Sequence, residues 1–170
     1  LIERELCERM GVSRTSIREA LRHLEAEHLI QVEARRGPVV ARMTRKQIAE
    51  IYEVRAMLEA TLVRRFAEMA SDEDIAALKR IYEDLRITRA TGEVPRIVVL
   101  TKRFIEHMMD VVDHELIGDI LRKLTARINV VRVLAIAIPG RLEESGRELA
   151  IVMDAIERRD SERAAQSLRA

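Results

Sequence analysis

Apolar residues recur at helical spacing over most of the chain and divide it into amphipathic helices. The first short run, Ile2, Leu6 and Met10, stops at Gly11, a residue that suits the end of a helix. Ser13 is placed to cap a second helix directly afterwards. The buried face of that second helix is predicted to comprise Ile17, Ala20, Leu21 and Leu24. The pattern therefore predicts two helices that meet at a tight turn.

The next segment changes to the alternating pattern of strands. Residues 30–34 and 38–41 are rich in β-branched side chains, and Arg35, Arg36 and Gly37 lie between them. Such a pattern around a glycine-containing turn predicts a β-hairpin. Helix, turn, helix and hairpin is the order of a winged helix-turn-helix, so we expect a DNA-binding domain over residues 1–43.

From Thr44 onward every pattern is helical. Thr44 and Gln47 have the spacing of a capping box. Ser71, Asp113 and either Asp160 or Ser161 are placed to cap later helices. The expected helices cover residues 44–70, 71–92, 95–112, 115–138 and 142–158, and a last one follows residue 160. Residues 44–170 are therefore predicted to form an all-α antiparallel helical bundle, and the fold class is mostly α.

Composition agrees with this division and narrows the function. Aromatic residues make up only 2% of the chain, and 30 basic residues face 29 acidic ones, so any nucleic-acid site must be local rather than a property of net charge. Cys7 is the only cysteine, which excludes an internal disulfide. The longest apolar run, Val130 to Ile138, is interrupted by Arg132 and is too short for a membrane span. We expect a cytoplasmic protein that makes no membrane contact, and a chain truncated at both ends.

Arg14, Arg18 and Arg22 form a basic stripe on the second helix, because they lie four residues apart, opposite the predicted apolar face. A guanidinium can bind guanine or phosphate, and hydroxyl groups near a helix N-terminus can bind phosphate. The hydroxyl groups in question belong to Ser13, Thr15 and Ser16. A solvated helix face is the alternative, but the surrounding turn and hairpin favour DNA binding.

The stretch LIERELCERMGVSRTSIREALRHLEAEHLIQVEARRGPVVA resembles the winged helix-turn-helix of GntR family transcription regulators, and the resemblance places the domain's first helix before Leu1. The remainder, with Arg55 and Glu59, resembles the FCD ligand-binding domain of the FadR subfamily. The resemblance implies a homodimer that binds a palindromic double-stranded DNA operator and responds to a ligand. The DNA contacts that it implies are Arg4, Ser13, Arg14, Thr15, Ser16, Arg18 and Arg22, with Arg36 and Gly37 at the wing tip.

Two positions depart from the family pattern in the DNA-binding domain. Ser16 stands where proline is usual, which costs little because serine is acceptable in a first helical turn. His28 stands where the family has glycine, so a left-handed backbone there would be modestly strained. Neither change removes an expected DNA contact.

The helical domain departs from the family at the metal site. Many FadR-subfamily bundles bind a divalent metal through an aspartate, a histidine four residues later and two further histidines. Alignment on Phe104 and Asp160 places Thr101, Ile105 and Leu149 at three of these positions, and the fourth falls beyond Ala170. We expect no metal and no cofactor, and a cavity that is mostly apolar or filled by side chains.

Arg55, Thr101, Ile105 and Leu149 are the residues expected to line an effector pocket. Arg55 either pairs with Glu59 or receives an anion such as a small organic acid, since a buried arginine needs a partner. Arg132 is expected to reach solvent. A second set, His107, Asp110 and His114, has a spacing that could serve a metal but is predicted to be a surface cluster.

Two alternatives to a ligand-responsive regulator follow from the same residues. One is a regulator that has lost effector sensing, which fits the missing metal ligands. The other is a helical-bundle enzyme with an N-terminal adaptor, but the sequence offers no nucleophile and base pair and no phosphate-binding glycine loop. We therefore predict a protein that is not an enzyme.

Overall fold

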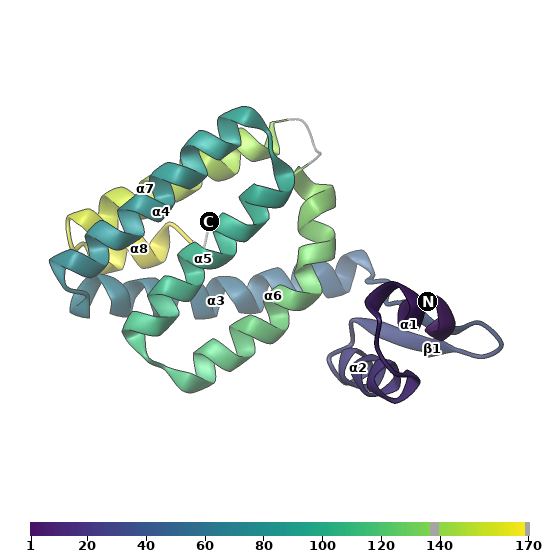
Figure 1. Ribbon diagram of the computed structural model, residues 1–170. Coiled ribbons are helices and arrows are strands. Elements are labelled where there is room, and N and C mark those ends of the chain that lie inside the picture. The colour runs from purple at the N-terminus through teal and green to yellow at the C-terminus, as the bar shows by residue number, and fades with distance from the viewer. Residues whose placement is uncertain (137–139, 169–170) are drawn as a thin grey trace. The chain divides into compact units, whose positions relative to one another are not determined.

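The computed structural model describes residues 1–136 and 140–168, and these form two compact units, Leu1–Gln47 and Ile48–Ala170 (Figure 1). The first unit contains helices α1 (Glu3–Met10) and α2 (Arg14–Ala26) and strands β1 (Ile30–Glu33) and β2 (Gly37–Val40). The predicted order of helix, turn, helix and hairpin is confirmed.

The core of the first unit is small. Ile17, Leu21 and Ile30 are buried, and Leu6, Cys7 and Leu24 pack against them. Ala20 is exposed, so its predicted burial is wrong. The physical reason is that α1 and β1 are the elements that pack on α2, and they cover only the stripe through Ile17, Leu21 and Leu24.

Backbone geometry explains the turns of this unit. Gly11 ends α1 in the left-handed region with φ 65°. The Ser13 side chain caps α2 by accepting a hydrogen bond from the Ser16 amide at 3.1 Å. His28 is left-handed with φ 58°, as the sequence allowed, and its amide donates to the Glu25 carbonyl at 2.9 Å. Histidine thus carries the strain that glycine would avoid at this position.

The second unit is helical throughout its described part. It contains most of α3 (Arg45–Met69), then α4 (Asp72–Thr91), α5 (Val94–Val112), α6 (Glu115–Ile136), α7 (Arg141–Glu157) and α8 (Ser161–Gln166). In Figure 1, α4 runs beside α7, and α4 also packs on α5, which packs on α6. Over the described ranges, none of the helices combines the length and apolar character needed to cross a bilayer.

Side-chain caps fix where several of these helices begin. Thr44 and Gln47 form the predicted reciprocal bonds at α3, Ser71 and Asp74 form them at α4, and Asp160 caps α8. Asp113 does not cap α6, contrary to the prediction. It ends α5 with φ 49°, and His114 takes the capping position because its Nδ1 accepts from the Ile117 amide at 3.4 Å.

Phe66 of α3 and Phe104 of α5 lie in the main core of the bundle, 0% and 2% exposed. The His107 ring packs edge-to-face on Phe66 with the centroids 5.9 Å apart, and its Nε2 hydrogen-bonds the Asp74 carbonyl at 2.9 Å. The predicted surface position is therefore wrong for His107, whereas Asp110 is exposed and His114 is half-buried. His107 is instead a structural residue that joins α5 to α3 and α4.

Candidate DNA-binding surface and effector cavity

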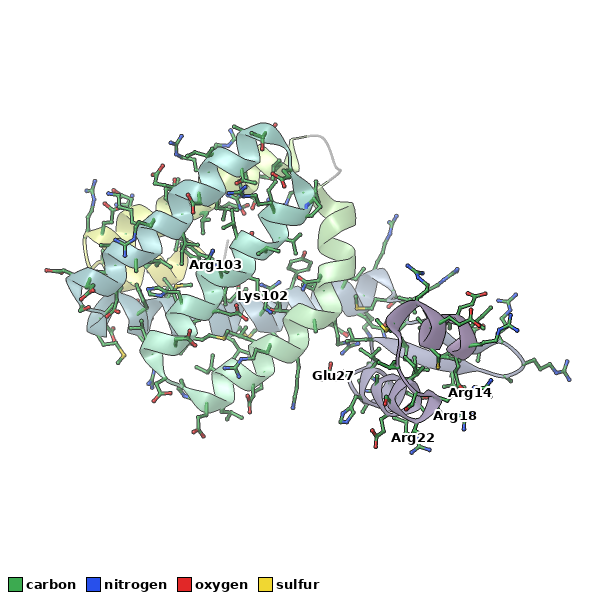
Figure 2. All side chains as sticks on the ribbon, viewed as in Figure 1. Arg14, Arg18, Arg22, Glu27, Lys102 and Arg103 are labelled. Atoms are coloured by element: carbon green, nitrogen blue, oxygen red, sulfur yellow. The ribbon has the colours of Figure 1, made fainter. Side chains whose placement is uncertain are left out.

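Three arginines are exposed along α2, one helical turn apart. Arg14 begins the helix, and Figure 2 shows Arg14, Arg18 and Arg22 on this element. Arg18 Nε lies 3.1 Å from Oε2 of Glu3 in α1. Arg14 and Arg22 have no ion-pair partner within the described ranges. Within the described residues, the stripe therefore carries two cations without an ion pair and one cation paired with a half-buried carboxylate.

The N-terminus of α2 adds hydrogen-bond donors beside these cations. Ser13, Thr15 and Ser16 are exposed, and the Ser13 and Ser16 hydroxyl oxygens lie 2.9 Å apart. The amides of a first helical turn and such hydroxyls can donate to a phosphate together. The predicted hydroxyl residues are thus brought together with Arg14 at one end of α2.

Of the remaining predicted DNA contacts, Arg4 and Arg36 are exposed and Gly37 is half-buried. Arg36 lies in the turn of the hairpin, 3.6 Å from Glu33, and Gly37 next to it has φ 75°. Arg4 in α1 lies 3.8 Å from Glu8. Exposed ion pairs of this kind contribute at most about 1 kcal/mol, so phosphate can displace either carboxylate.

A cavity of about 270 Å³ lies within the second unit, between α3, α4, α5 and α7. Arg55, Thr101, Ile105 and Leu149 all line it, so the structure brings together the four residues selected from the sequence. Its other lining residues are Tyr52, Ala56, Glu59, Leu85, Arg89, Ile97, Phe104, Arg141, Leu142, Ser145, Glu148 and Leu168. Of the two expected alternatives, a mostly apolar cavity and one filled by side chains, the second is wrong.

Arg55 is committed to an ion pair with Glu59, and its side chain is 6% exposed. Its Nε is buried without a hydrogen-bond partner, and its guanidinium carbon lies 6.0 Å from the centroid of the Tyr52 ring. Arg55, Thr101 and Ile105 also line a second cavity of about 200 Å³ next to α6. Arg55 is therefore a paired, buried cation shared by two cavities.

Sequence reasoning missed the polar wall that α4 and α7 contribute. Arg141 is held by Glu144 at 3.1 Å and Glu148 at 3.0 Å, and chiefly the Glu148 hydrogen bond raises the pKa of Arg141. Arg89 donates only to the Ser145 carbonyl and hydroxyl, both at 3.3 Å. Burial lowers the pKa of Arg89. The Arg89 contacts join segments 56 residues apart and leave no local motif in the sequence, whereas the Arg141 pairs lie within α7.

A signal for Arg89 did exist in the helical period of α4. Leu78 and Leu85 are fully buried, and Arg89 lies one turn after Leu85 on the same side of the helix. An arginine that continues an apolar face is a candidate for a buried polar role. The Arg132 side chain, by contrast, lies outside the described residues.

The positions of the family's metal ligands hold groups of other chemistry. Thr101 donates its hydroxyl hydrogen to the Ile97 carbonyl at 2.8 Å, and Ile105 and Leu149 present only carbon. Over residues 1–136 and 140–168, no three histidine, cysteine, aspartate or glutamate side chains gather in a geometry that could hold a metal. The cavity wall therefore offers charge and hydrogen bonds rather than metal ligands.

Comparison with known families gives two matches that together cover most of the chain. Residues 50–170 match the FCD domain, and residues 1–40 match the bacterial regulatory proteins of the gntR family. The boundary between the two matches falls within residues 41–49.

Individual relatives agree with these matches. The chain is 28% identical to an uncharacterized HTH-type transcriptional regulator, YdhC of Bacillus subtilis, over 96% of this chain and 74% of that protein. It is 29% identical to the gluconate operon transcriptional repressor of the same organism, over 91% of this chain and 62% of that protein. The solved structure of McbR/YncC from E. coli covers 99% of this chain and 80% of that one, with 25% identity and a TM-score of 0.86.

Proposed function

The chain belongs to the FCD family and carries a GntR-type DNA-binding domain. We propose that it acts as a homodimer whose affinity for a palindromic operator is controlled by a small molecule. It is a DNA-binding transcription regulator and not an enzyme. The alternative of a helical-bundle enzyme with an N-terminal adaptor is therefore wrong.

The exposed basic stripe on α2 is the observation that supports assigning DNA binding to particular residues. Arg14, Arg18 and Arg22 lie on one face behind a helix N-terminus rich in hydroxyl groups. A recognition helix reads base edges through its N-terminal residues, while cations farther along meet phosphates. Arg14 and Arg18 are therefore assigned to bases or phosphates, and Arg22 to a phosphate. A regulator of this kind binds its operator in the cytoplasm.

The cavity supports the sensing role. Three arginines and two glutamates line it beside an apolar floor, so it suits a small organic acid. No metal enters this proposal, because Thr101, Ile105 and Leu149 occupy the ligand positions. A regulator that has lost effector sensing is the remaining alternative, and it would leave operator affinity unchanged by every small acid tested.

Arg18→Ala tests the DNA-binding assignment. An operator selected from a random DNA pool by the full chain is titrated at fixed salt. Loss of a base-contacting arginine is expected to weaken specific binding by about 10- to 100-fold, because such a contact contributes about 1–3 kcal/mol. Fluorescence anisotropy with labelled duplex measures the change.

Arg103→Ala is the matched control. Arg103 is an exposed arginine of α5 in the helical unit, labelled in Figure 2 with its neighbour Lys102. This variant should bind the operator like the unmodified chain. Unchanged affinity of Arg18→Ala would contradict the assignment of α2 as the recognition helix.

A further inference from the structure

Of the three arginines that line the 270 Å³ cavity, Arg89 is the one without a carboxylate partner among the described residues. Glu59 holds Arg55, whereas Glu144 and Glu148 hold Arg141. Arg89 is anchored only through two long bonds to Ser145, and its Nε is buried without any partner. Burial lowers the pKa of Arg89, and the attraction of Glu148 opposes this lowering only from beyond ion-pair distance. An anion in direct contact would stabilise such a half-buried guanidinium.

We propose that Arg89, with the hydroxyl of Ser145, is the receptor for the carboxylate of a small organic monoanion. Glu59 pairs with Arg55, and Glu144 and Glu148 pair with Arg141, so Arg89 is the lining cation that an added carboxylate can contact. The planar fork of arginine suits the two oxygens of a carboxylate. The carboxylate of the effector would thus bind to side chains of α4 and α7. It would not bind at the positions that hold the metal in relatives with the metal site. This inference rests on the proposed sensing function.

The rest of the cavity defines the body of that ligand. Leu142 and Leu149 pack against the buried Leu85 and Ile97, which gives the site an apolar floor. A cavity of about 150 Å³ is sufficient for benzene in another protein. The volume of about 270 Å³ therefore admits a ring or a short hydrocarbon chain together with its carboxylate.

Paired probes test the inference without DNA. Benzoate and hexanoate are titrated into the full chain, with their uncharged amides as matched probes, and binding is followed by calorimetry and thermal shift. At least one acid should bind and raise the unfolding temperature, while its amide should not. A chelator present throughout should not change the affinity. Overturning results would be binding of neither acid, equal binding of the amide, or a requirement for metal.

Variants then locate the charge. Arg89→Gln should weaken binding of the acid by about 10- to 100-fold, because a hydrogen bond to a charged group is lost. Arg89→Lys should retain part of the affinity, and it serves if the glutamine variant does not fold. Arg86→Gln is the control, since Arg86 is an exposed α4 residue paired with Glu83 at 2.8 Å. Equal binding by the Arg89 variants and the control would overturn the inference.

Operator binding is measured separately with the same acid. If the acid binds through Arg89 but leaves operator affinity unchanged, the site stands and the proposed sensing function fails. If operator affinity changes with the acid in Arg89→Gln as it does in the unmodified chain, sensing stands and this site fails.

Discussion

At the scale of single residues, the DNA-binding unit holds its cations in contacts that are easily exchanged. Arg18 and Glu3 form an ion pair although the Arg18 side chain remains 63% exposed. Water screens such a pair, so it contributes little to stability and can be replaced by a contact with DNA. Glu3 therefore orients Arg18 in the free protein and opposes its transfer to DNA.

Glu3→Gln is expected to raise DNA affinity up to about fivefold, because the variant releases Arg18 and removes a negative charge beside it. Anisotropy titrations at constant salt measure this effect. Glu83→Gln provides the comparison, since it frees Arg86 in the helical unit and should leave affinity unchanged. A lower DNA affinity of Glu3→Gln would contradict this expectation and would mean that Glu3 supports the geometry of Arg18 in the complex with DNA.

At the scale of elements, capping bonds decide where the helices start. Ser71 and Asp74 exchange hydrogen bonds at the start of α4, with the Ser71 hydroxyl 2.6 Å from Asp74 Oδ2. The side-chain bond from Ser71 chiefly lowers the pKa of Asp74, and the backbone bond from Ser71 adds to this effect. The start of α4 therefore depends on an ionised Asp74.

Asp74→Asn should lower the unfolding temperature at neutral pH and lose that effect in acid. A lowered pKa in the folded state means that the ionised carboxylate stabilises the fold above its ordinary pKa of 3.8. This contribution disappears as the pH falls through the lower folded value. Thermal unfolding from pH 7 to below pH 4 should therefore show the two proteins converging.

Glu73→Gln is the control for this titration, because it removes a charge from the same helical turn without touching Ser71. Its difference from the unmodified chain should be smaller at pH 7. A constant gap between Asp74→Asn and the unmodified protein across the acid range would contradict the role of the carboxylate.

At the scale of the whole molecule, the two units have separate cores of unequal size. The first unit buries Ile17, Leu21 and Ile30, whereas the core around Phe66 and Phe104 draws on most of the bundle helices. Small units bury a lower fraction of their surface and are less stable on their own. Local opening should therefore be more frequent in the DNA-binding unit than in the bundle.

Leu21→Ala should destabilise the first unit by about 2–5 kcal/mol, since it removes a buried side chain from a small core. Hydrogen exchange read by mass spectrometry should show faster exchange in α2 and β1, with the peptides of α4 and α5 unchanged. Leu116→Ala changes an exposed leucine and should alter neither unit. Equal loss of protection in both units would show that the cores unfold together.

Local patterns in the sequence determined the elements and the exposed basic stripe on α2. Caps such as Ser13 and Ser71, the turn at Gly11 and the spacing of Arg14, Arg18 and Arg22 act within a few residues, so the order of the chain records them. The same spacing that buries Ile17 and Leu21 turns the arginines outward.

Only the tertiary structure decided which distant residues share the cavity wall. The sequence selected Arg55, but the hydrogen bonds that hold Arg89 in the cavity wall go to Ser145, which lies 56 residues away. Likewise, His107 is half-buried against the core because Phe66 and Asp74 approach it from other helices. Charge pairing and burial arise from packing between elements, and a helical period fixes only the side of a helix on which a residue lies.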